Sequence, residues 1–261
     1  MAAPGRDEIA LAVAAIEGLI EGEIPEVADV PAVSLDLVER VRDLVEAAVR
    51  TDVGPDARAA AAALVDRATE LLKAATHDEV VRFARTADGR IDQLTQAGSG
   101  ALNPQAPRLV FREPPRPAAR VHAATDGPRA VELVADCRLT AAHSGPPGRA
   151  HGGVVATILD HVLGIAAAEA GAPGFTGGLE VRYRAATPYD VPLEIRARWT
   201  HSDGRKSFAT GEVLAEGRVT AEATAVFVAP RDNRMRLPRA ADPEPEAGPE
   251  PEAEPEVAAR T

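Results

Sequence analysis

Apolar residues recur every three to four positions through the first third of the chain, the spacing of an amphipathic helix. This part is rich in alanine and contains no constellation of side chains that suggests catalysis. We interpret residues 1–92 as a helical N-terminal region that packs on the main domain or aids oligomerisation. The helices predicted within it are residues 9–20, 37–49, 56–73 and a short segment, 77–85.

Two segments of biased composition flank residues 120–232. Residues 93–119 are rich in glycine and proline, and end in Pro114-Pro-Arg-Pro117. This composition is typical of a linker, in which the stretch 103–111 is expected to form an ordered edge of the domain that follows. Residues 233–261 are dominated by proline and glutamate, which cannot bury a core, so a disordered acidic tail is expected there.

From residue 120 the hydrophobic period changes from that of a helix to that of a strand, and residues 120–232 are predicted to form the main domain. Asp203-Gly204 and Glu216-Gly217 are turn signals between the later strands. One long helix among antiparallel strands predicts an α+β fold in which the sheet wraps the helix. The expected strands are residues 121–125, 130–137, 178–186, 193–200, 206–215 and 219–228.

The single helix of this domain, predicted from about residue 152 to 170, is apolar on nearly every face, yet Asp160 lies in its middle. Such a helix is normally buried, and a carboxylate is rarely buried without a partner or a function. His151 lies one residue before the start of the helix and nine positions before Asp160. Helical geometry separates the two by about 13 Å along the axis and places them on opposite sides. They cannot meet within one helix.

Small residues share the face of this helix that carries Asp160, which lets a second backbone approach closely. We therefore infer a dimer whose central helices lie near each other and whose active sites are shared, so that one chain brings His151 to the Asp160 of its partner. The residues of this face, besides Asp160, are Gly153, Thr157, Gly164 and Ala168.

Composition indicates which kinds of partner and which cellular compartment to expect. The formal net charge of −11 argues against nucleic acid as the main partner. A single cysteine, Cys137, rules out an internal disulfide and a cysteine-rich metal site, and fits a reducing cytoplasm. The first residues lack the basic-then-apolar order of a signal peptide. We expect a cytoplasmic protein with no metal site and neither nucleic acid nor a membrane as partner.

Three ordered motifs carry a resemblance to a known family: Gly145-Pro-Pro-Gly-Arg-Ala-His-Gly-Gly-Val-Val-Ala156, then Leu159-Asp160, then Thr176-Gly-Gly-Leu-Glu-Val-Arg-Tyr-Arg184. With them, residues 98–229 resemble the hotdog-fold acyl-CoA thioesterases of the phenylacetate-degradation and acyl-coenzyme A thioesterase type. The resemblance implies an antiparallel sheet wrapped around a long helix, acyl-CoA as substrate, no cofactor besides the coenzyme A of that substrate, and a homodimer or a dimer of dimers (a homotetramer).

The resemblance also implies roles for single residues. Asp160 would be the general base for water or the nucleophile, and Thr176 would hold Asp160 or its water. The N–H of Gly152 would polarise the thioester carbonyl, with His151 beside it and Gly153 in the substrate site. Independent physical reasoning agrees, because thioester hydrolysis develops an oxyanion and free N–H groups at a helix N-terminus stabilise one.

Two further positions bear on substrate binding. Related enzymes often carry an asparagine six residues before the histidine, whereas this chain has Gly145 there, which leaves the positioning of water open. Arg205 and Lys206, in the turn after Gly204, are interpreted as ligands of the coenzyme A phosphates. The alternative for both is a solvated end of a strand.

Other functions fit the residues less well. A Ser-His-Asp hydrolase would need a Gly-x-Ser-x-Gly motif, which is missing from the sequence. A hotdog dehydratase would need an acid-base pair of Asp and His at a different spacing. The remaining alternative is a regulatory or scaffold protein of the same fold that binds acyl-CoA without turning it over. The presence of both Asp160 and the His151-Gly-Gly153 turn favours the enzyme.

Overall fold

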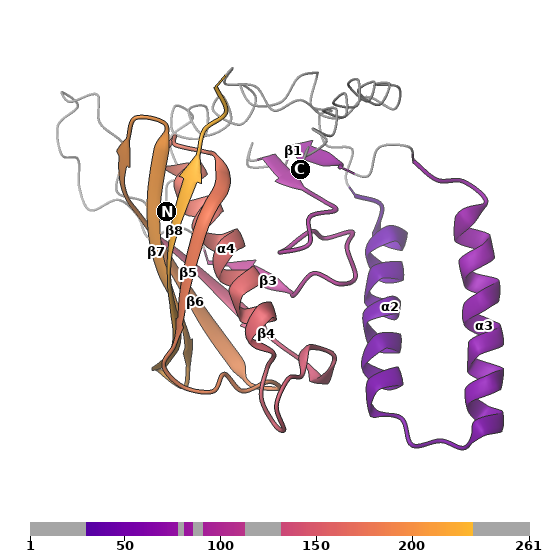
Figure 1. Ribbon diagram of the computed structural model, residues 1–261. Helices are drawn as coiled ribbons and strands as arrows, with labels where there is room; N and C mark the ends of the chain where they lie inside the picture. Colours follow the sequence, from indigo (N-terminus) through magenta and orange to yellow (C-terminus); the bar gives the residue numbers. More distant parts are fainter. Residues whose placement is uncertain (1–29, 78–80, 86–90, 113–131, 232–261) are drawn as a thin grey trace, which may run out of the picture.

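The computed structural model describes residues 30–77, 81–85, 91–112 and 132–231. The predicted helix at 9–20, the predicted strand at 121–125 and the acidic tail lie outside these described residues. Figure 1 shows the arrangement of the rest: a twisted sheet, one helix lying against it, and two helices to one side.

The sheet has six strands in the order β3-β4-β6-β7-β8-β5, and every neighbouring pair is antiparallel. Gly204 and Gly217 form the hairpin turns with positive φ values of 55° and 74°, which glycine adopts without strain. The turns predicted at these two positions are therefore confirmed. The strands are β3 (Leu109–Phe111), β4 (Glu132–Arg138), β5 (Phe175–Tyr183), β6 (Pro192–Asp203), β7 (Lys206–Ala215) and β8 (Arg218–Val228).

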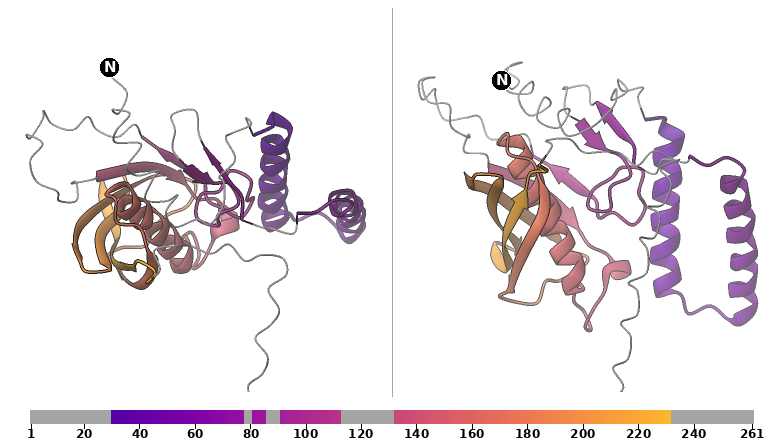
Figure 2. Two further views of the ribbon diagram at one scale, coloured as in Figure 1. Left: turned by 90° about the horizontal axis from the view of Figure 1, so that it is seen from above. Right: turned by 45° about the horizontal axis from the view of Figure 1, so that its top comes forward.

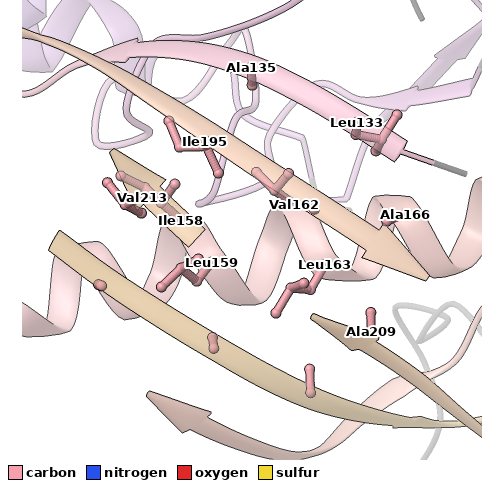
Figure 3. Packing of buried hydrophobic residues seen from close by; sticks show 14 of the residues in the cluster. Leu133, Ala135, Ile158, Leu159, Val162, Leu163, Ala166, Ile195, Ala209 and Val213 are labelled. Carbon is pink, nitrogen blue, oxygen red and sulfur yellow. The ribbon is translucent and has the colours of Figure 1, made fainter. Parts of the chain in front are cut away.

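Helix α4 (Gly152–Glu169) lies against one face of this sheet and forms the core with it. Leucine, isoleucine and valine side chains of α4 interdigitate with alternate residues of β4, β6 and β7 (Figure 3). Many of the opposing sheet residues are alanine, which lets the helix lie close; a Cβ on Gly211 would meet the Leu163 side chain at 3.0 Å. The predicted α+β architecture, with a sheet wrapped around one helix, is confirmed.

Length and composition alone would allow α4 to cross a membrane, since its mean hydropathy is 1.4. Seven of its residues are buried against the sheet, however, which is the position of a core helix in a globular domain. The helix is buried along only part of its circumference, so a face that carries Asp160 remains accessible in the single chain.

The two edges of the sheet differ in length. Strand β3 has three residues, and such a short edge offers little backbone to another chain. Strand β5 has nine residues, pairs with β8 alone among the described strands, and is exposed along most of its length. A long exposed edge strand is a template for pairing with a further strand.

Of the two N-terminal helices that the structure describes, α2 is the one that packs on the main domain. Helix α2 (Ala32–Arg50) buries Val38 and contacts the 3₁₀ turn η1 (Ala141–His143), where the Glu46 carboxylate accepts the N–H groups of Ala141 and Ala142 at 3.3 and 3.0 Å. Helix α3 (Pro55–Lys73) has no buried residue and stands apart from α2 in both views of Figure 2.

The helix predicted at residues 77–85 is wrong. Residues Phe83–Arg85 form strand β1, which pairs with β2 (Ile91–Gln93) as a small separate sheet. Pairing with β2, which follows along the chain, supplies hydrogen bonds that the local helical pattern did not predict. The predicted edge at 103–111 contains β3, which pairs with β4.

Candidate active site

Backbone hydrogen bonds hold the turn that precedes α4. The N–H of Gly145 donates to the Arg149 carbonyl at 2.8 Å, and the N–H of His151 donates to the His143 carbonyl at 2.9 Å. The Ala150 N–H donates to the Thr187 carbonyl at 2.9 Å, which ties the turn to the segment after β5. These bonds place His151 as the N-cap of α4, with its side chain exposed.

Gly145 packs against the backbone of His151. A Cβ at position 145 would lie 3.1 Å from the His151 backbone nitrogen and 2.8 Å from its Cα, and the second distance is shorter than real Cβ contacts. An asparagine would not fit in this conformation of the turn. Glycine at position 145 therefore permits the close packing of this turn on His151.

The first N–H groups of α4 are divided between two uses. The imidazole Nδ1 of His151 accepts the N–H of Gly153 at 3.0 Å, so the neutral ring carries its proton on Nε2. The N–H of Gly152 has no hydrogen-bond partner within the part of the chain that the structure describes. A free N–H and an Nε2–H therefore lie at one helix N-terminus, where the helix dipole favours negative charge.

Both glycines of this turn are explained by neighbouring rings. A Cβ on Gly152 would lie 3.2 Å from the Tyr183 ring and hydroxyl, and a Cβ on Gly153 would lie 3.1 Å from the His151 Nδ1. A side chain at either position would press a ring out of place. The hydroxyl of Tyr183 donates to the Gly152 carbonyl at 2.7 Å.

Asp160 lies two and a half turns further along α4 and is partly buried. The hydroxyl of Thr176, on β5, donates to its Oδ1 atom at 2.9 Å, which leaves Oδ2 free of any described partner. A β-bulge between Thr176 and Gly178 changes the alternation of β5 at this point. Thr176 therefore faces α4, as Leu179, Val181 and Tyr183 do, although strict alternation would point it away.

The structure does not bring His151 and Asp160 together within one chain. His151 is the N-cap of α4 and Asp160 lies nine positions further along the helix, as the sequence predicted. The small-residue face is open at Gly153 and Thr157, which are exposed, but Gly164 lies against the Phe227 ring of β8, where an added Cβ would meet the ring at 3.4 Å. The accessible part of this face is thus the half nearer to the N-terminus of α4.

A mostly apolar hollow of about 240 Å³ adjoins Gly152. Val155, Ala150 and Tyr183 contribute to its walls, and Arg149 contributes a cation. Tyr183 thus contacts both the hollow and the helix N-terminus. The sequence pattern predicted no role for Tyr183. The feature that could have indicated one is the alternation of Leu179, Val181 and Tyr183, which places all three on the same face of the strand.

Arg205 and Lys206 lie at the other end of the sheet. Lys206 is in register with Val228 of β8, which is in turn in register with Phe175, the first residue of β5. The Arg205 guanidinium donates to the Ala229 carbonyl at 2.7 Å and remains exposed. Both cations are therefore nearer to the Thr176 end of β5 than to its Tyr183 end.

His161 points away from Asp160 and contacts a different segment. Its Nε2 atom forms a hydrogen bond with the Ser99 hydroxyl, and Gly98 lies so close that a Cβ there would overlap the ring. Burial lowers the pKa of His161 to about 4. A neutral, partly buried histidine that bonds Ser99 anchors a loop and is not a partner of Asp160.

Other nucleophiles and metal ligands give no competing site. Cys137 is buried, and its burial raises the pKa of the thiol to about 12, so it is not a reactive thiolate. In the described ranges no group of three or more histidine, cysteine, aspartate or glutamate side chains is arranged to hold a metal ion.

Comparisons with known proteins agree on one family. The family model of the thioesterase superfamily matches residues 147–222, which include His151, Asp160, Thr176 and Tyr183. A curated relative, the acyl-coenzyme A thioesterase THEM4 of Xenopus laevis, is 31% identical over 86 residues. That match covers 32% of this chain and 39% of the relative, so the chain matches well under two thirds of the relative's length.

A solved structure extends the likeness beyond the matched motif. The crystal structure of a thioesterase superfamily protein aligns with this chain at a TM-score of 0.62 and 28% identity. The alignment covers 100% of that chain and 79% of this one, more than the residues of the sheet and α4 alone could supply. The similarity thus includes part of the chain before β4.

Proposed function

Because the chain belongs to the thioesterase superfamily through its hotdog domain, we propose that it hydrolyses acyl-CoA thioesters to a free acid and coenzyme A. The observation that carries this proposal is that α4 holds both parts of such a site at separate places. They are the Asp160 carboxylate, which accepts a hydrogen bond from Thr176 at 2.9 Å, and a helix N-terminus with a free Gly152 N–H. The acyl-coenzyme A activity named for the THEM4 relative supports the substrate class.

In this proposal, the carboxylate of Asp160 accepts a proton from a water molecule through Oδ2, and the water oxygen attacks the thioester carbonyl carbon. The carbonyl oxygen gains negative charge, which the N–H of Gly152 and the Nε2–H of His151 stabilise. The C–S bond then breaks, the acid is released, and the coenzyme A thiolate takes up the proton. The alternative is direct attack by the Asp160 carboxylate on the carbonyl carbon, which expels the coenzyme A thiolate and forms a mixed anhydride; water then hydrolyses this anhydride to the free acid and the Asp160 carboxylate.

The two halves of this chemistry require two chains. Asp160 and His151 are about 13 Å apart along one helix axis, too far to act on one carbonyl group. We propose that two copies pair along β5, the nine-residue edge strand that carries Thr176 and Tyr183. Such a two-fold arrangement would present the His151 turn of one copy to the Asp160 of the other, and two dimers could associate further.

Arg205 and Lys206 are proposed to bind the coenzyme A phosphates. Their support is position and charge: both lie exposed beside the start of β5, at the end of the sheet where Thr176 is. Phosphate recognition by an exposed guanidinium and ammonium is electrostatic, so substitution should raise KM with little effect on kcat. If both were merely solvated strand ends, KM would not change.

The experiment that tests the proposal measures free-thiol release from short, medium, long and aromatic acyl-CoAs by the full chain and by Asp160→Asn. Asparagine keeps the volume but cannot accept the proton, so kcat should fall on the order of 100-fold or more. Asp66→Asn, the same change on the exposed surface of α3, serves as the control. Binding of acyl-CoA without thiol release by the unmodified chain would indicate a regulatory protein and overturn the enzymatic proposal.

A further inference from the structure

Tyr183 is connected to His151 through a single peptide group. Its hydroxyl donates to the carbonyl of Gly152 at 2.7 Å, and the N–H of the same peptide group, which belongs to Gly153, donates to the His151 Nδ1 at 3.0 Å. The two bonds follow one direction, from the hydroxyl to the carbonyl and from the amide N–H to the imidazole Nδ1, and they leave the proton of the neutral imidazole on Nε2.

Bonds arranged in this way strengthen one another. A hydrogen bond accepted by a peptide carbonyl polarises the peptide and makes its N–H a better donor. A better donor at Gly153 favours the imidazole tautomer whose Nδ1 is an acceptor, and that tautomer carries its proton on Nε2. Tyr183 and His151 lie on opposite sides of the Gly152–Gly153 peptide group. Tyr183 therefore favours the tautomer of His151 that could donate to a substrate carbonyl.

The packing around Gly152 shows that this contact is built into the turn. The Tyr183 ring lies where a side chain on residue 152 would be, at 3.2 Å from an added Cβ. Strand β5 thus contacts α4 through two hydroxyl groups, Thr176 at Asp160 and Tyr183 at Gly152. One strand orients both parts of the candidate site.

We propose that Tyr183 is a positioning residue that fixes His151 as the Nε2–H tautomer and so prepares the imidazole to donate to the thioester oxygen. This inference rests on the proposed thioesterase function for its catalytic consequence, but not for the tautomer. Tyr183 does not touch the reacting atoms in this assignment; it acts through the Gly152–Gly153 peptide.

The test compares Tyr183→Phe with Tyr189→Phe, a change in the only other tyrosine of the chain. Phenylalanine keeps the ring against Gly152 and removes only the hydroxyl. The tautomer is read from the ring ¹⁵N chemical shifts of His151, and the donor strength of Gly153 from its amide proton shift and hydrogen exchange, both by NMR on the full chain. Turnover of an acyl-CoA gives kcat and KM.

For Tyr183→Phe we expect a mixed tautomer at His151, faster exchange of the Gly153 amide, and a kcat about 3- to 10-fold lower with little change in KM. Tyr189→Phe should leave all four quantities as they are. Unchanged His151 and Gly153 signals in Tyr183→Phe would overturn the proposal. So would a rise in KM alone, which would assign the hydroxyl to substrate binding in the hollow instead of to the positioning of His151. Altered signals in a chain without any thiol release would refute the thioesterase function while the positioning of His151 stands.

Discussion

The Thr176 hydroxyl donates a hydrogen bond to the Oδ1 atom of Asp160, and it does so from a strand whose alternation is reversed by a β-bulge. The bond fixes the rotamer of a carboxylate that lies on an otherwise apolar helix. It also leaves Oδ2 as the atom available to water. The geometry of the candidate base therefore depends on the edge strand β5 as well as on α4.

Removing this hydroxyl should impair turnover. Thr176→Val keeps the shape and the strand preference but lacks the donor, so the carboxylate loses its fixed orientation. We expect kcat to fall about 10-fold with a smaller change in KM. Steady-state kinetics of thiol release measure both constants. Thr224→Val, on the exposed outer face of β8, is the matched control; an equal loss in both variants would contradict a specific role for Thr176.

The His151 ring depends on the absence of a side chain at Gly153. An added methyl group would lie 3.1 Å from Nδ1, so Gly153→Ala should turn the imidazole away from its N-cap position. Losing an N-cap costs about 1 kcal/mol of stability, and kcat/KM should fall about 10-fold. Gly54→Ala, at a position with nothing within 4 Å of the added carbon, is the control for kcat/KM only, because Gly54 is the N-cap residue of α3. Full activity in Gly153→Ala would argue against a role for His151.

Much of this fold could be predicted because local pattern and tertiary structure agree. The second and third helices, the last three hairpin strands and their two glycine turns follow from period and turn chemistry, and the structure has them within a few residues. Local pattern failed at 83–85, where apolar spacing suited a helix but pairing with Ile91–Gln93 decided the outcome.

The sequence was sufficient to predict which residues form the candidate site, but not which side chains contact one another there. His151, Gly152 and Asp160 were identified from their motif and their places at the start and middle of one helix. The bulge that turns Thr176 toward α4, and the inward ring of Tyr183, depend on the register between β5 and β8, which sequence spacing does not specify. The tight packing at Gly145 likewise depends on the path of the turn in space.

Stability should depend on pH through His161. The ring is buried and its pKa is lowered to about 4 from an ordinary 6.5, so the unfolded chain binds this proton more readily than the folded one. The stabilisation is complete above pH 6.5 and is lost as the pH falls toward 4, by about 3 kcal/mol in full. Urea unfolding of the full chain at pH 7.5, 6 and 5 measures it.

The matched variants for this measurement are His161→Gln and His201→Gln. The first removes the titrating ring that bonds Ser99, so its stability should change less between pH 7.5 and 5 than that of the unmodified chain. The second changes an exposed ring that stacks on Phe208 and should leave the pH dependence unchanged. A pH dependence that persists in His161→Gln would assign it to other groups.

The docking of α2 should depend on Glu46. Burial would raise the pKa of this carboxyl, but hydrogen bonds from Thr140, Arg50 and Ala142 outweigh it and lower the pKa to about 2. The stabilisation is therefore present above pH 4.5 and is lost as the pH falls toward 2. Glu46→Gln should destabilise the chain at pH 7 by about 1–2 kcal/mol and speed amide exchange in α2. Glu70→Gln, in the exposed pair with Lys73, should change neither, and equal effects would argue against the docking role.

Mixing two inactive variants tests whether sites are shared between chains. In a heterodimer of Asp160→Asn and His151→Ala chains, one site combines an intact His151 from the first chain with an intact Asp160 from the second. The other site lacks both. Random reassociation after unfolding and refolding should therefore restore about one quarter of the unmodified activity, because about half of the dimers are mixed and each has one complete site. Sites built within one chain would give no recovery, since each chain lacks one of the two side chains. Recovery that requires refolding together, and is missing when the separately folded variants are simply combined, would also show that the dimer exchanges slowly.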